Sequence, residues 1–143
     1  MFKRILVPLD GSKLAEQALP YAEELATKFG ATVYLVRAIP KPDVPAAPLN
    51  VAAVEDMAEQ QAERYLDRIE KRLADANIKV ETRDVVGQNA TEVIKYVASE
   101  EQVDLIIVVS RGRSGLLRTI FGSTIDDLVR DPSQPVLVIK GEE

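Results

Sequence analysis

The chain has 143 residues, 46% of them hydrophobic and 29% charged, which is the balance of one globular domain with a single core. Its 18 basic and 23 acidic residues give a net charge of -5, which argues against a general surface for nucleic acid or an anionic membrane. Cysteine and histidine are both absent, which excludes disulfides, Cys/His zinc sites and every catalytic triad that needs imidazole.

The first part of the chain predicts a strand, a turn and a helix. Residues 4–10 (RILVPLD) are a nearly continuous apolar run, typical of a strand that is covered on both faces. Residues 10–12 (DGS) supply turn and helix-capping side chains. Apolar residues then recur at three- and four-residue steps over residues 14–29, which predicts an amphipathic helix that Gly30 ends. Pro20 lies inside this pattern and predicts a kink or a local irregularity.

The middle of the chain continues the alternation of strand and helix. Residues 32–39 predict the second strand, and residues 40–50, which include four prolines, predict a long exposed loop. A second helix is expected over residues 54–76. Residues 79–86 alternate charged and apolar side chains, which favours a strand near one edge of the sheet. A third helix is expected over residues 90–101.

The last part predicts two more strands around a glycine-rich stretch. Residues 104–110 form the most strongly apolar strand, a helix is expected over residues 123–130, and residues 135–140 predict the fifth strand. Strict alternation of strands and helices predicts a parallel sheet with helices on both faces, in one α/β domain over residues 1–143. No signal peptide or bilayer-spanning run is visible, so we expect the cytoplasm.

Polar and glycine residues follow two of the predicted strands. Ligands of open parallel sheets bind outside the carboxyl ends of the strands, where the strand order reverses. The stretch SRGRSGLLRTIFGST (residues 110–124) follows the fourth strand. Gly112 would let a ligand approach the main chain, and Gly122, Ser123 and Thr124 lie at a helix start, where free amides favour phosphate. Asp10, after the first strand, could accept hydrogen bonds from a ribose. Together these features indicate a nucleotide.

A plainer interpretation of the same residues stays open. The glycines could form only a tight turn, Ser123 could be a helix cap without a ligand, and Asp10 could merely cap the first helix. Three arginines of the stretch could form a solvated face: Arg111, Arg113 and Arg118. The stretch is neither a Walker A loop nor a GxGxxG fingerprint.

Two long segments, KRILVPLDGSKLAEQAL and DLIIVVSRGRSGLLRTIFGSTIDDLVRDPSQPVLVIK, resemble the start and the end of universal stress proteins. The resemblance covers essentially the whole chain. The ATP-binding branch of that family carries the signature G-x2-G-x9-G-[ST]. Gly112, Gly122 and Ser123 satisfy the second part of it, whereas the first glycine would fall at Val109. A valine there could narrow the pocket near the ribose.

The resemblance implies a fold and a set of site residues. The fold is an open five-stranded parallel sheet of strand order 3-2-1-4-5, Rossmann-like and similar to the adenine nucleotide alpha hydrolases. Asp10 matches the aspartate associated with adenine and ribose, and Ala38 falls where a backbone contact to adenine is made. The nucleotide-binding residues are then expected to be Pro8, Leu9, Asp10, Ala38, Val109, Arg111, Gly112, Arg113, Gly122, Ser123 and Thr124.

The function that the resemblance implies is that of a cytoplasmic stress-response protein that binds ATP or AMP and acts as a regulatory module on an unknown protein partner. We expect no dedicated catalytic residue and no resident metal site; any ATP hydrolysis would be slow and rest on positioning and a Mg²⁺ ion. The alternative is a nucleotide-free dimeric interaction module, toward which Val109 would be a step. An ATP-consuming enzyme is the least favoured, because no general base is evident.

Members of the family mostly dimerise through the last strand. Residues 135–140 are short, apolar and terminal, so we expect a homodimer that pairs these strands across a two-fold axis. The alternative is a monomer in which the charged tail, residues 140–143, protects the edge of the sheet.

Overall fold

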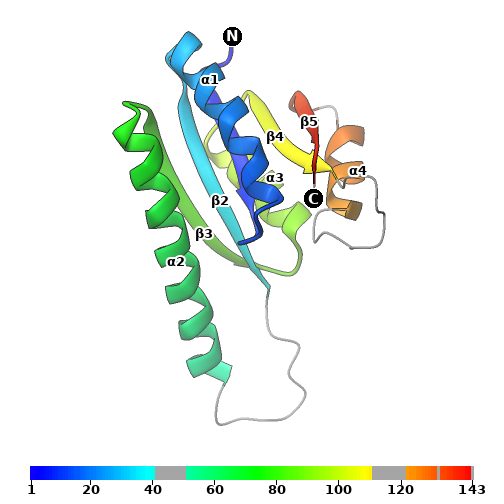
Figure 1. Ribbon diagram of the computed structural model, residues 1–143. Coiled ribbons are helices and arrows are strands. Elements are labelled where there is room, and N and C mark those ends of the chain that lie inside the picture. The colour runs from blue at the N-terminus through cyan, green and yellow to red at the C-terminus, as the bar shows by residue number, and fades with distance from the viewer. Residues whose placement is uncertain (41–50, 111–121, 132, 143) are drawn as a thin grey trace.

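The computed structural model describes residues 1–40, 51–110, 122–131 and 133–142. In chain order its elements are β1 (Arg4–Leu9), the 3-10 helix η1 (Ala15–Ala18), α1 (Leu19–Phe29), β2 (Thr32–Pro40), α2 (Val51–Asp75), β3 (Lys79–Gly87), α3 (Ala90–Glu100), β4 (Leu105–Ser110), α4 (Gly122–Arg130) and β5 (Val136–Lys140). All strands are parallel and their order is β3-β2-β1-β4-β5, which confirms the expected topology. Helices α1 and α2 cover one face of the sheet, and α3 and α4 lie behind it (Figure 1).

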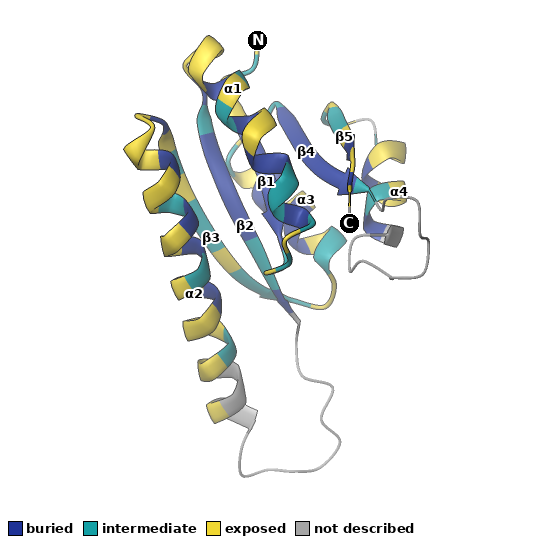
Figure 2. Ribbon diagram, viewed as in Figure 1, coloured by how far each residue is buried: buried dark blue, intermediate teal, exposed yellow. Residues whose placement is uncertain are grey.

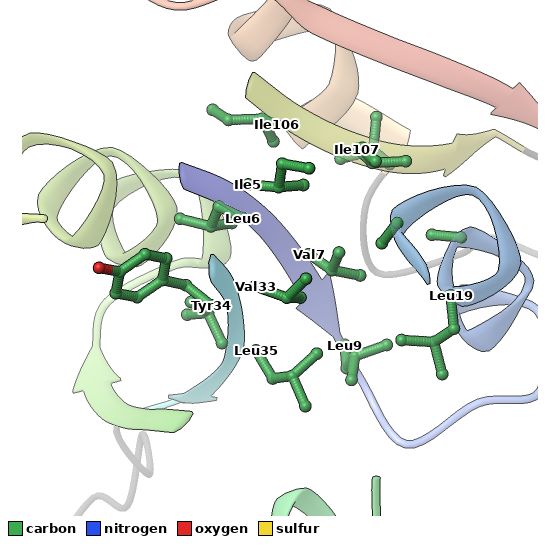
Figure 3. Packing of buried hydrophobic residues seen from close by; sticks show 14 of the residues in the cluster. Ile5, Leu6, Val7, Leu9, Leu19, Val33, Tyr34, Leu35, Ile106 and Ile107 are labelled. Carbon is green, nitrogen blue, oxygen red and sulfur yellow. The ribbon is translucent and has the colours of Figure 1, made fainter. Parts of the chain in front are cut away.

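The core lies on both faces of the three central strands. β1 is buried from Ile5 to Leu9 and β4 from Leu105 to Val109, so each reads as a continuous apolar run in the sequence. Figure 2 shows this buried band, and Figure 3 shows side chains of β1, β2 and β4 packing with Leu19 of α1. Each fully buried leucine or isoleucine stabilises the fold by about 1.5–3 kcal/mol relative to an exposed one.

The first helix differs from the single helix expected over residues 14–29. The chain first forms η1, and α1 begins at Leu19, so that Pro20 occupies its first turn. A proline is tolerated there because the N–H that it lacks would have no partner inside the helix. The irregularity expected at Pro20 is therefore a boundary between two helix types. Gly30 ends α1 in the left-handed conformation, φ 66°, as predicted.

The remaining elements agree with the sequence, with ends that differ by at most three residues. β3 is an edge strand, as its alternating pattern predicted. Asn89 caps α3 by accepting a hydrogen bond from the Glu92 N–H at 2.9 Å. β2 extends to Pro40, which the sequence assigned to the loop, and the rest of that loop, residues 41–50, lies outside the described residues. Within the described part of the chain, no helix is both long and apolar enough to cross a bilayer.

Candidate functional site

Strand β1 is paired very differently with its two neighbours. On one side the ladder with β2 runs along the whole strand, from Arg4 opposite Thr32 to Leu9 opposite Arg37. On the other side only the first part of β1 pairs with β4, and this ladder ends at Leu6 opposite Ile106. We call these the β1–β2 seam and the β1–β4 seam. The β1–β4 seam is the place where the strand order reverses, and it lacks ladder pairing toward the carboxyl ends.

Pro8 explains why the β1–β4 ladder stops. The Thr32 N–H donates to the Lys3 carbonyl, and the Asp104 N–H donates to the Arg4 carbonyl, each at 2.9 Å. Successive residues of a parallel strand alternate between neighbours, so even-numbered residues of β1 direct their main chain toward β4. Pro8 is such a residue and has no N–H to donate. A proline in this central strand therefore removes a donor from the β1–β4 seam and none from the β1–β2 seam.

The turn after β1, residues 10–12, is ordered by its own side chains. Asp10 Oδ1 accepts the Ser12 N–H at 2.8 Å and also the Ser12 hydroxyl. The Ser12 Oγ in turn accepts the Ala15 N–H at 3.1 Å, so the first N–H of η1 is bonded to Ser12 and not to Asp10. Gly11 has φ 88°, which only glycine adopts without strain. Asp10 is half-buried, and its Oδ2 accepts no hydrogen bond from the described residues.

Val109, at the end of β4, places its side chain in the core. The residue is only 4% exposed. A Cβ on Gly141 would come within 2.8 Å of Val109 Cγ1 and would also meet Leu14, so the valine fits against the bare main chain of Gly141. The Ile106 N–H donates to the Pro135 carbonyl at 3.0 Å, so even-numbered residues of β4 face β5. The main chain of Val109 accordingly faces β1 and borders the β1–β4 seam.

The structure locates the other expected residues as follows. Pro8 and Leu9 are buried at the end of β1, and Ala38 is half-buried on β2, one residue beyond Arg37, which lies opposite Leu9. α4 begins with Gly122 and Ser123, and the side chain of Thr124 is 3% exposed. Arg111, Gly112 and Arg113 lie outside the described residues. The ends of β1 and β2 thus lie side by side, with β4 following β1 in the sheet.

Sequence reasoning missed two residues beside the Asp10 turn. Arg37 of β2 lies against Gly11, and its Cζ is 5.0 Å from the centre of the Tyr65 ring on α2. Burial raises the pKa of the Tyr65 phenol, and the nearby carboxylates of Glu16 and Asp10 raise it further. The signal in the sequence was a single arginine inside the otherwise apolar run TVYLVRAI. A charge in a buried strand needs a partner or a function.

The chemistry available at this end of the sheet is that of binding. Three groups here suit a sugar and an anionic phosphate: a main chain without ladder pairing, a carboxylate oxygen with no donor among the described residues, and the first amides of the nine-residue helix α4. Within the described ranges, no three acidic side chains gather in a way that could hold a metal ion.

The chain is similar to known proteins in both sequence and fold. The profile of the universal stress protein family matches residues 1–140. The universal stress protein MJ0577 of Methanocaldococcus jannaschii is 32% identical over 98% of this chain and 96% of its own length. The solved structure of MJ0577 superposes with a TM-score of 0.85, at 30% identity and with 100% and 99% of the two chains covered.

More distant structures share the fold. A universal stress family protein from Burkholderia pseudomallei superposes with a TM-score of 0.77 at 27% identity, with 96% of each chain covered. A universal stress protein from Archaeoglobus fulgidus, solved in complex with dAMP, gives a TM-score of 0.69 at 22% identity, with 98% and 100% coverage. With the family profile matching almost its whole length, this chain belongs to the universal stress protein family.

Proposed function

We propose that this universal stress protein binds ATP or AMP in the β1–β4 seam and acts as a regulatory module on a protein partner, with at most slow hydrolysis. The observation that carries the proposal is the loss of pairing beyond Leu6, in the strand that Asp10 follows and beside β4, after which α4 is the next helix in the chain. Asp10 Oδ2 would accept a ribose hydroxyl, and the first amides of α4 at Gly122 and Ser123 would bind phosphate.

Two further observations support this assignment. The Val109 side chain is packed in the core, so only the main chain of this residue borders the β1–β4 seam. The valine that replaces the first signature glycine therefore does not fill the seam with its side chain. Structures of this fold have been solved with cAMP and with dAMP, at 21% and 22% identity to this chain. Those ligands belong to those proteins, and they support the proposal that a chain of the same fold binds an adenine nucleotide.

The test combines released ligand with calorimetry. Mass spectrometry of freshly purified, denatured protein should detect an adenine nucleotide, and titration with ATP and AMP should give saturable binding. Gly122→Val should abolish the binding, because a side chain there would occupy the space that phosphate needs. Asp126→Val, which puts the same side chain on an exposed position of α4, is the matched control and should bind as the parent does. Equal affinity in Gly122→Val and the parent would disprove the phosphate assignment.

We further propose that β5 pairs with its copy in a homodimer. In β5, the Pro135 carbonyl and the Gly141 N–H bond to β4, so the main chains of Val136 and Val138 point away from the sheet. Val138 is 38% exposed. Glu142 of the tail pairs with η1 instead: its N–H donates to Gln17 Oε1 at 2.9 Å, and the side-chain amide of Gln17 donates to the Glu142 carbonyl.

Light scattering should therefore give twice the 15.7 kDa of one chain. Val138→Pro removes an outward N–H and should yield folded monomers, because the β4–β5 ladder keeps all its donors. Leu137→Pro is the contrasting variant, since it removes a donor inside that ladder and should lower the melting temperature of the subunit. A parent protein that is monomeric at micromolar concentration would overturn the proposed interface.

The alternative function, a nucleotide-free dimeric interaction module, rests on Val109 and on this same edge strand, β5. It predicts a dimer of the expected mass from which no nucleotide is released and which gives no calorimetric signal with ATP or AMP. Both functions therefore predict the same dimer mass in light scattering, and they differ in whether nucleotide binding is detected.

A further inference from the structure

A cluster of charged and aromatic side chains lies next to the Asp10 turn, on the face of the sheet covered by α1 and α2. We call it the Arg–Tyr cluster; it comprises Asp10, Glu16, Arg37, Tyr65 and Arg68. Val33 and Leu35 share the alternating face of β2 with Arg37, and both are fully buried. Arg37 thus interrupts this apolar face, which continues with the buried Ile39, and it lies one residue before Ala38.

The guanidinium of Arg37 contacts the turn and helix α2 at the same time. A Cβ built on Gly11 would lie 3.1, 3.3 and 3.4 Å from Nη1, Nη2 and Cζ of Arg37, so the end of the guanidinium that carries its two terminal nitrogens packs against Gly11. The same Cζ lies 5.0 Å from the centre of the Tyr65 ring, within the range of a cation–π contact. A glycine is therefore favoured at position 11 for two reasons: the main chain has a positive φ there, and Arg37 packs where a side chain would lie.

The charges around this contact explain why the position carries a cation. Burial raises the pKa of the Tyr65 phenol, the Glu16 and Asp10 carboxylates raise that pKa further, and Arg37 opposes them. Arg37 thus lies near two carboxylates, yet among the described residues no acidic oxygen comes within 4.0 Å to form an ion pair with it. Its energetic contribution is stacking and charge compensation rather than one salt bridge.

We propose that Arg37 is a positioning residue of the nucleotide site: seated between Gly11 and Tyr65, it holds the Asp10 turn in the shape that binds ribose, and it connects that turn to α2. This inference rests on the proposed function, because ribose is the group that Asp10 would accept. Removing Arg37 takes away the contact between the turn and β2, and leaves the hydrogen bonds within the turn and those that connect Ser12 to Ala15 and Glu16. Adenine would keep its main-chain contact at Ala38 on the neighbouring strand, so its binding should depend less on the turn than the binding of ribose does.

The experiment compares three variants with two ligands. AMP carries the ribose and adenine does not, so the ratio of their affinities reports on the turn. We expect Arg37→Leu to weaken AMP binding about tenfold while adenine binding changes less than about twofold, on the scale of one lost charge-assisted contact. Arg37→Lys keeps the charge without the flat stacking group and should recover part of the loss. Arg68→Leu is the matched control, because Arg68 also lies 5.3 Å from the Tyr65 ring but belongs to α2.

A second measurement needs no ligand. Amide hydrogen exchange of Ser12, whose N–H is bonded to Asp10, should be faster in Arg37→Leu than in the parent and unchanged in Arg68→Leu. Unchanged exchange, or an equal loss of AMP and adenine binding in Arg37→Leu, overturns the positioning role. A parent protein that binds neither ligand refutes the proposed function instead, and the exchange result then still decides whether Arg37 holds the turn.

Discussion

The two seams of β1 show how one strand can provide stability on one side and a binding site on the other. The β1–β2 seam is paired along the entire strand, whereas the β1–β4 seam is paired only at its first part. Both seams consist of buried apolar strands, so hydrophobicity does not distinguish them. The difference comes from the missing N–H of Pro8, because residue 8 faces β4. Pro8 accounts for the point at which the β1–β4 ladder stops, because residue 8 can accept but cannot donate a hydrogen bond on the β4 side.

Arg37 connects the two seams. It belongs to the β1–β2 seam by register, opposite Leu9, and its side chain supports the turn that borders the β1–β4 seam. The fully paired β1–β2 seam thus supplies a rigid platform for the β1–β4 seam, as expected when a site is built on strands and supported by packed neighbours.

The largest expected effect concerns the β4 side of the open seam. Val109→Gly should lower the free energy of unfolding by about 2–4 kcal/mol, because it empties core volume beside Leu14 and Gly141 and puts a glycine in a strand. Since the side chain lies in the core, AMP affinity should change less than about threefold despite the restored signature. Urea unfolding and calorimetry measure the two quantities. Tighter binding at unchanged stability would show that Val109 obstructs the seam.

The next effect tests Pro8 directly. Pro8→Val supplies an N–H that faces β4 and should extend the ladder past Leu6, which brings the strand ends together. We expect AMP affinity to fall by about tenfold and the free energy of unfolding to stay constant or to rise by about 1 kcal/mol, the value of one added hydrogen bond. Pro20→Ala, in the first turn of α1 and away from both seams, is the control. Retained affinity in Pro8→Val would mean that the break in pairing is not what opens the site.

The smallest effect concerns the turn at the end of the seam. Ser12→Ala removes the cap on the Ala15 N–H and the hydroxyl donor to Asp10, and should cost about 1 kcal/mol of stability in thermal or urea unfolding. AMP binding should weaken by about threefold, because the Ser12 N–H still holds Asp10. An effect on affinity as large as that of Arg37→Leu would show that Ser12, rather than Arg37, is the main support of the turn.

Much of the fold could be predicted from the sequence because the decisive signals are local. Continuous apolar runs marked β1 and β4, alternation marked the edge strand β3, and Gly30 marked the end of α1. The boundary at Pro20 was the main departure. Helical periodicity continues through residues 14–29, and it does not distinguish a 3-10 turn followed by an α-helix from one longer helix. The strand order followed from the resemblance to a family rather than from periodicity.

The candidate site divides in the same way. Its residue types were visible in the sequence: Asp10 in a turn, Pro8 before it, and glycines after a strongly apolar strand. The sequence could not say toward which neighbour Pro8 points or on which side of β4 the Val109 side chain lies, because these directions depend on register and strand order. It also could not bring Gly11, Arg37 and Tyr65 together. These residues lie far apart in the chain, and only the packing of β1, β2 and α2 places a guanidinium where a glycine leaves room for it.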